Sequence, residues 1–287
     1  MILNYKEFEE IFNKKLFENS SKKLFETIAK NPDRYVGLFR PTKPYTKIIQ
    51  NITQSHEIRF GDAMEVLFEK YFEKSEYELL NKKIESSDNI YNIDQLFKID
   101  KKIIFIEQKV RDDHDSTKKR GQFKNFEDKY SILEDIYEDY EIFSVMWFID
   151  DSLSKNKNYY QEEINKMSKD YNANVKLCYG ETLFLDLNFL NQNIWIEVLN
   201  YLETWKHSLP DMPEVNFDLS CDEKFEEVKT LTPSTFRKFF DDERIVEEIL
   251  PILSPKKHFL NKLKNYFEAQ KKPVYKNLAE KIEKISY

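Results

Sequence analysis

The sequence predicts an α/β protein with a mixed central sheet flanked by helices and a helical C-terminal portion. Helical spacing, with apolar residues three and four positions apart, occurs in residues 5–29, 61–74 and 121–137. Runs of β-branched and aromatic residues, short enough for strands, occur in residues 92–99, 102–110 and 141–149. Beyond residue 223 the pattern is helical, with breaks at prolines.

The N-terminal part of the chain is predicted to be mostly helical. The first helix has a break at residues 19–21, and residues 31–44, with three prolines and a glycine, form a connecting loop. A further helix covers residues 45–53. Gly61 then opens the helix that runs to residue 74, because Asp62 is a good N-cap and Glu65, three residues later, fits a capping box.

The middle of the chain is predicted to supply the sheet. Residues 77–84 form a first strand, and the next two strands are joined into a hairpin by Asp100 and Lys101. A helix leads from this hairpin to the buried strand at residues 141–149, which we expect to be parallel to its predecessor through a right-handed crossover. Three further elements follow: a helix at residues 159–171, a short strand at 174–179 and a helix at 191–205.

Two prolines mark residues 207–222 as a linker. We therefore expect one domain in residues 1–206, including the N-terminal helices, and a separate helical region in residues 223–287. The length of 287 residues fits one large domain or two small ones.

The composition excludes several function classes. The chain has four glycines, at least 24 positions apart, so neither a dinucleotide-binding nor a Walker-A glycine motif can occur. Two cysteines cannot build a four-cysteine zinc site or a disulfide framework. The longest strongly apolar run has eight residues, whereas a membrane helix needs about 20. With no signal-peptide pattern at the start, we expect a cytoplasmic protein without membrane partners.

The net charge of −7 argues against a nucleic-acid partner, but the charge is uneven along the chain. Residues 116–124 carry four positive charges and no acid, and residues 255–287 carry nine lysines against three glutamates. Residues 127–151 instead carry nine acids and one lysine. The sequence therefore predicts a basic loop and a basic C-terminal end within an acidic protein.

The predicted hairpin brings two acids and a lysine together. If Asp100 and Lys101 form a two-residue turn, Asp94 lies opposite Glu107, and opposed residues of an antiparallel pair have Cβ atoms about 4.5–5.5 Å apart. Two such carboxylates could bridge one Mg²⁺ ion. Lys109 shares a strand face with Glu107 and could orient a water molecule there. The alternative is a purely structural ion pair between Glu107 and Lys109.

Ile93-Asp94 followed by Glu107-Gln108-Lys109 on a hairpin, with a helix and a strand after it, resembles the PD-(D/E)XK nuclease superfamily and most of all its type II restriction endonucleases. The resemblance covers residues 60–150, and Ile93 stands where the family motif has proline. It implies a restriction-endonuclease-like core in which Asp94 and Glu107 bind Mg²⁺ and Lys109 helps to activate water. The backbone carbonyl of Gln108 would complete the metal shell.

Many members of this superfamily carry a further acid on the preceding helix, and Glu65 matches it. The alternative role for Glu65 is the capping box. The polar segment after the catalytic strand is expected to be a loop that holds DNA phosphates, with Gln122 facing the active site and three cations, Lys118, Lys119 and Arg120. The alternative is a solvated loop.

These observations together predict a type II restriction endonuclease, which cleaves double-stranded DNA at specific sites by Mg²⁺-dependent phosphodiester hydrolysis. Residues 1–206 would be catalytic, and residues 223–287 would serve DNA binding or dimerisation. A homodimer would match a two-fold symmetric site, and a cognate DNA methyltransferase would be the genetic partner. Two alternatives stay open: a repair, recombination or mobile-element nuclease on the same core, and a non-catalytic helical interaction protein.

Overall fold

The computed structural model describes residues 2–75, 77–86, 89–186 and 191–287. The chain divides into two compact units. Unit 1 comprises residues 1–12 and 60–208, and unit 2 comprises residues 13–59 and 209–287. Residues 13–59 are therefore grouped with the C-terminal region, although they precede the sheet in the sequence. The functional roles predicted for the two parts of the chain stay predictions.

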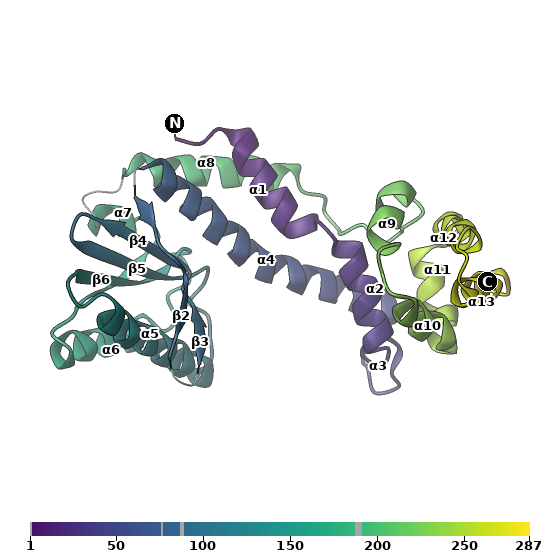
Figure 1. The fold of residues 1–287 in the computed structure, drawn as a ribbon, viewed down its shortest axis with the longest axis horizontal. Helices are drawn as coiled ribbons and strands as arrows, with labels where there is room; N and C mark the ends of the chain where they lie inside the picture. Colours follow the sequence, from purple (N-terminus) through teal and green to yellow (C-terminus); the bar gives the residue numbers. More distant parts are fainter. Residues whose placement is uncertain (1, 76, 87–88, 187–190) are drawn as a thin grey trace. The chain divides into compact units, whose positions relative to one another are not determined.

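Unit 1 is built on a five-stranded mixed sheet in the order β1-β4-β5-β6-β7, with a separate two-stranded sheet of β2 and β3 (Figure 1). Strands β5, β6 and β7 are parallel, and β4 is antiparallel to both β1 and β5. The strands are β1 (Glu78–Leu79), β2 (Lys83–Glu85), β3 (Ile90–Asn92), β4 (Gln95–Ile99), β5 (Lys102–Lys109), β6 (Glu141–Phe148) and β7 (Asn174–Tyr179). The predicted α/β class and the parallel crossover after the hairpin are confirmed.

Helices cover both faces of the larger sheet. On one face Phe105 stacks on Phe126 of α5, with ring centroids 5.1 Å apart. On the other face Trp147 packs edge-on against Phe68 of α4, and Trp195 of α8 also contacts it. The helices of this unit are α5 (Ser116–Ile136), α6 (Lys157–Asp170), α7 (Thr182–Asp186) and α8 (Asn193–Ser208), with parts of α1 (Tyr5–Phe17) and α4 (Pro44–Lys74). Burial on two faces explains why β6 is an almost continuous apolar run.

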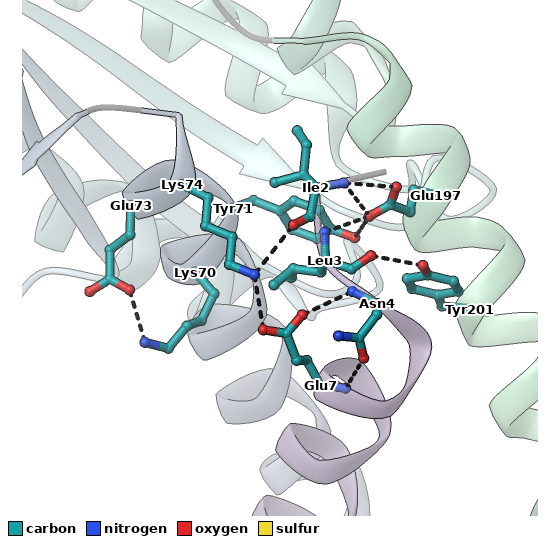
Figure 2. Close-up of polar contacts among 10 residues, drawn as sticks. All are labelled: Ile2, Leu3, Asn4, Glu7, Lys70, Tyr71, Glu73, Lys74, Glu197 and Tyr201. Atoms are coloured by element: carbon teal, nitrogen blue, oxygen red, sulfur yellow. Dashed lines mark hydrogen bonds and ion pairs between the residues drawn. The ribbon is translucent and has the colours of Figure 1, made fainter.

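The start of the chain is fixed against α4 and α8 by polar contacts (Figure 2). The Glu197 carboxylate on α8 accepts hydrogen bonds from the backbone nitrogens of Ile2 and Leu3 and from the Tyr71 hydroxyl of α4. Lys74 donates to the Ile2 carbonyl at 3.3 Å. These bonds attach the N-terminal segment to the same unit as the sheet.

Unit 2 is helical and has an apolar core in which Phe25 stacks on Phe239, with ring centroids 3.7 Å apart. Two separate stretches of sequence build this core, one before the sheet and one after it. The helices are α2 (Ser20–Lys30), α3 (Asp33–Val36), α9 (Cys221–Val228), α10 (Pro233–Asp241), α11 (Leu250–Leu253), α12 (His258–Glu268) and α13 (Pro273–Glu283), with a π-helical turn at Ile245–Ile249. No helix in the described ranges of either unit is long and apolar enough to cross a membrane.

The prediction of separate helices at residues 45–53 and 61–74 was wrong, because α4 runs unbroken from Pro44 to Lys74. Gly61 and Asp62 lie inside this helix, so Asp62 is not an N-cap and Glu65 is not part of a capping box. A glycine inside a helix costs about 1 kcal/mol relative to alanine. The neighbouring residues Ala63, Met64 and Leu67 are fully buried, and their packing outweighs this cost.

The predicted basic loop is also helical. Helix α5 begins at Ser116, because the Asp115 carboxylate caps it by accepting from the backbone nitrogens of Thr117 and Lys118. The cations of residues 116–124 therefore lie on the first turns of a helix and not in a loop before it. The hairpin turn was predicted correctly, since Ile99 pairs with Lys102 and Gln95 with Ile106. Asp100 adopts φ 51°, a backbone conformation that aspartate tolerates better than most residues.

A buried aspartate fixes the chain after β5. Asp112 is fully buried and accepts hydrogen bonds from the backbone and side-chain nitrogens of Asn156, at 2.7 and 2.8 Å, and from the Tyr179 hydroxyl at 2.9 Å. The carboxylate ties the segment before α5 to the start of α6 and the end of β7.

We expect Asp112→Ala to lower the free energy of unfolding of unit 1 by about 2–4 kcal/mol, because three buried donors lose their acceptor. All three tryptophans of the chain lie in unit 1, so tryptophan fluorescence in a urea titration reports this unit. Asp113→Ala is the control, since Asp113 is exposed, and should change the value by less than about 1 kcal/mol. Equal effects of the two substitutions would contradict the role given to Asp112.

Candidate active site

Three oxygen atoms converge on one lysine at the end of the hairpin. The Lys109 Nζ lies 2.8 Å from Asp94 Oδ2, 2.8 Å from Glu107 Oε1 and 3.1 Å from the backbone carbonyl oxygen of Gln108. Asp94 directly precedes β4, and Glu107 and Lys109 share one face near the end of β5. The structure therefore brings together Asp94, Glu107, Gln108 and Lys109, as the hairpin register predicts.

The position of Asp94 is set by the backbone of the opposite strand. Its Oδ2 accepts a hydrogen bond from the backbone nitrogen of Gln108 at 2.8 Å, in addition to the one from Lys109. On the opposite face of the hairpin, Gln95 Nε2 donates to the Glu65 carbonyl at 2.7 Å and to Gln108 Oε1 at 3.2 Å. Helix α4 is therefore bonded to the hairpin next to the cluster.

A second lysine, which the sequence analysis missed, completes the cluster. Lys129 of α5 lies 2.6 Å from Glu107 Oε2, and both side chains are only 5% exposed. Each oxygen of the Glu107 carboxylate therefore faces its own ammonium group. A signal for Lys129 was present in the sequence. It falls between Phe126 and Leu133 on the apolar face of a helix, where a lysine is costly without a buried acid as partner.

The charges of this cluster affect the protonation of Lys109. Burial by itself lowers the pKa of a lysine, but here the charges of Glu107 and Asp94 and the hydrogen bonds to them outweigh it. The pKa of Lys109 is therefore raised well above its ordinary value. The Lys109 ammonium group therefore contacts both carboxylates and balances their charge together with Lys129.

Glu65 lies beside this cluster, with a lysine of its own. Its carboxylate pairs with Lys82 at 2.5 Å, and Lys82 also pairs with Glu69 at 2.7 Å. Burial raises the pKa of Glu65, and the charge of Asp94 adds to this effect, whereas Lys82 opposes it. The negative charges of Glu65 and Asp94 are thus close enough to affect each other.

The predicted DNA-binding residues lie apart from these contacts, on the first turns of α5. Lys118 and Arg120 are exposed, and the Lys119 Nζ lies 4.5 Å from the centre of the Tyr159 ring. Gln122 Oε1 accepts a hydrogen bond from Tyr160 at 2.8 Å.

Several of the basic residues near the C-terminus pair with acids of their own unit. Lys262 pairs with Asp222, Lys281 with Asp241, and Lys264 with Glu283 at 3.1 Å. These ion pairs account for part of the surplus positive charge in residues 255–287. Exposed ion pairs of this kind are weak, so the lysines can exchange their partners.

The donor set around Lys109 suits a hard divalent cation. No cluster of three or more histidine, cysteine, aspartate or glutamate side chains that could hold a metal occurs in the described part of the chain. Mg²⁺, however, commonly binds through one or two carboxylates and fills its remaining positions with water or phosphate oxygens. Asp94, Glu107 and the Gln108 carbonyl already lie around one cationic group, and they fit this requirement.

Comparison with known proteins identifies one family. A family model described as "Type II restriction endonuclease, HinfI" matches residues 4–90 and 76–206. The matched residues include Glu65, the hairpin and all of α5. No curated protein and no solved structure matches the chain.

We expect Lys129→Met to lower the free energy of unfolding of unit 1 by about 1–3 kcal/mol, because Glu107 stays buried with one cationic partner in place of two. Lys124→Met is a matched control on the same helix. Lys124 also pairs with acids, but its side chain is 66% exposed, and its loss should cost less than about 1 kcal/mol. Urea titrations followed by tryptophan fluorescence measure both values. A loss no larger for Lys129→Met than for the control would contradict the role given to Lys129 as a buried partner of Glu107.

Proposed function

We propose that this chain, which belongs to the HinfI family of type II restriction endonucleases, cleaves double-stranded DNA at specific sites in a Mg²⁺-dependent reaction. Its family acts on DNA phosphodiester bonds. The observation that carries the finer proposal is the convergence of Asp94, Glu107 and the Gln108 carbonyl on the ammonium group of Lys109. Three oxygen donors that surround the Lys109 ammonium group can also hold a metal cation.

The three oxygen donors would hold the Mg²⁺ ion. When bound, Mg²⁺ supplies positive charge that acidifies water and stabilises the charge that develops on the attacked phosphate. Asp94 is suited to this role because the Gln108 backbone nitrogen already fixes its carboxylate. Glu107 keeps its orientation through Lys129, which contacts the oxygen that faces away from Lys109.

Lys109 would act on the water and the phosphate. Its ammonium group is the one that must give up contacts with the carboxylates when a metal ion binds them. It then has hydrogen bonds available for the attacking water and for a phosphate oxygen. This is the role expected for a lysine two residues after the metal-binding glutamate, because the two side chains lie on the same strand face.

We propose Glu65 as a third acid of the site. It lies on α4, which Gln95 bonds to the hairpin, and its charge interacts with that of Asp94. In this structure Lys82 neutralises it together with Glu69. If Lys82 paired with Glu69 alone, the Glu65 carboxylate would add negative charge near the metal-binding oxygens.

The start of α5 is the proposed contact to DNA. Lys118, Lys119 and Arg120 would bind phosphates, and the helix N-terminus favours the same negative charge. Gln122 belongs to the same surface. The proposed homodimer would place two such sites on a two-fold symmetric target, and a methyltransferase would protect the cell's own copies of that target.

We expect Asp94→Asn, Glu107→Gln and Lys109→Met each to reduce cleavage by on the order of 100-fold or more, because each removes a metal ligand or the group that orients the water. Glu65→Gln should have a smaller effect. The assay follows fragments of phage DNA on gels, with Mg²⁺ and after chelation by EDTA, which should stop the reaction.

Glu141→Gln serves as the matched control, since Glu141 is an exposed acid at the other end of β6 and pairs there with Lys102. It should leave cleavage unchanged. Calorimetric titration with Mg²⁺ separates the roles: Glu107→Gln should lose binding, whereas Lys109→Met should bind the ion at least as tightly as the wild type. Full activity in Glu107→Gln or Lys109→Met would refute the site.

The DNA contact is tested by salt dependence. Each phosphate contact contributes about 0.9 to the slope of log K against log salt concentration, so replacing Lys118, Lys119 and Arg120 by Gln should reduce the slope by about 2–3. Replacing three exposed, ion-paired lysines elsewhere in unit 1 gives the control with the same change of charge; these are Lys6, Lys83 and Lys102. Equal slopes for the two triple variants would contradict this contact.

A further inference from the structure

Two large apolar side chains project side by side from a turn of unit 2. Leu38 is 91% exposed and Phe39 is 97% exposed, which makes them the most exposed large apolar residues in the described part of the chain. Single exposed apolar residues are common and need no explanation. Two adjacent ones that leave almost their entire surface in water do need one.

The turn that carries them is tightly built. Any side chain at Gly37 would bring its Cβ to 2.4 Å from the Asp33 carbonyl oxygen, so only glycine fits there. The Arg40 nitrogen donates to the Gly37 carbonyl at 3.1 Å, and Arg40 Nε donates to the Asp33 carbonyl at 3.2 Å. These bonds close the turn around Leu38 and Phe39 and present both side chains at its tip.

The segment that carries the tip has an excess of positive charge. Residues 34–56 contain neither aspartate nor glutamate and form the longest acid-free stretch of the sequence. Arg34, Arg40 and Lys43 flank the tip and are exposed. Glu248 shares a surface hollow with Arg40 and Lys43.

We propose that Leu38 and Phe39 form a wedge that inserts between base pairs of duplex DNA, while the flanking cations contact the phosphates. Apolar wedges of Phe or Leu are used in this way by proteins that partly unstack and bend the duplex. This inference rests on the proposed function, since it takes double-stranded DNA as the ligand. It concerns unit 2 alone and is independent of the residues placed in the active site.

Charge and area favour DNA over a protein partner. A stable protein interface buries about 800 Å² on each side, far more than two side chains can cover. The cations around the tip would also repel the same surface of a second copy of this chain. A DNA phosphate backbone is instead attracted by these cations, and the gap between two base pairs accepts flat or branched apolar groups.

The test uses the target sequence of the enzyme itself. Sequencing the ends of phage DNA fragments identifies the cleavage site, and duplexes that contain it are prepared with 2-aminopurine at successive positions. The protein is then titrated in Ca²⁺, without Mg²⁺. We expect 2-aminopurine fluorescence to rise at one step when the wild type binds, because unstacking relieves its quenching.

The Leu38→Ala/Phe39→Ala double variant should bind at least about tenfold more weakly and lose this fluorescence rise. Leu219→Ala is the control, since Leu219 is a 67% exposed leucine of the same unit, and it should keep both properties. Melting followed by circular dichroism should be unchanged in all variants, because none of these side chains is buried.

Three outcomes would overturn the wedge alone, and a fourth would overturn it together with the proposed function. The first is a double variant that keeps the affinity and the fluorescence rise of the wild type. In that case cleavage by the wild type would still support the proposed function. The second is a double variant that binds more weakly but keeps the fluorescence rise. The third is an oligomeric state that depends on Phe39 while DNA binding does not. If the wild type neither binds nor cuts DNA in any divalent ion, the proposed function and the wedge both fail.

Discussion

The carboxylate of Glu107 is the charge on which the rest of the site depends. It is almost fully buried at the end of an apolar strand, a position that a carboxylate can occupy only with partners for both of its oxygens. Lys109 supplies one partner from the same strand, and Lys129 supplies the other from the helix that covers it. Asp94 joins this cluster through Lys109. Helix α4 is bonded to the opposite face of the same hairpin through Gln95, which donates to the Glu65 carbonyl.

This arrangement follows from the topology of the sheet. The antiparallel hairpin brings Asp94 opposite Glu107, and the crossover through α5 returns the chain to β6 while laying the helix over the same face as Glu107. Alternation along β5 then directs Glu107 and Lys109 to one face and the Gln108 side chain to the other. One face of β5 therefore carries both the buried Phe105, which packs on α5, and the paired Glu107 and Lys109.

The hairpin and its register could be predicted from the sequence because a two-residue turn fixes which residues oppose each other. The start of α5 could not be found from apolar spacing, since its first two turns are polar and only the Asp115 cap marks them. The unbroken helix α4 could not be predicted either. Glycine usually weakens helices, but tertiary packing continues α4 through Gly61. Spacing along the chain does not show which helix or loop faces each acid. The pairing of Lys129 with Glu107 and of Lys82 with Glu65 therefore could not be predicted.

The discontinuous core of unit 2 has a consequence for the order in which the chain can fold during synthesis. Phe25 and its neighbours pack against residues from Val215 onward, which leave the ribosome after the whole of unit 1. The sheet and its helices are complete once residue 208 has emerged, so unit 1 can reach its native packing first. The apolar face of α2 then stays exposed to solvent until the residues of α10 have been synthesised. A prematurely terminated chain could therefore contain Asp94, Glu107, Lys109 and Lys129 and still be removed as misfolded.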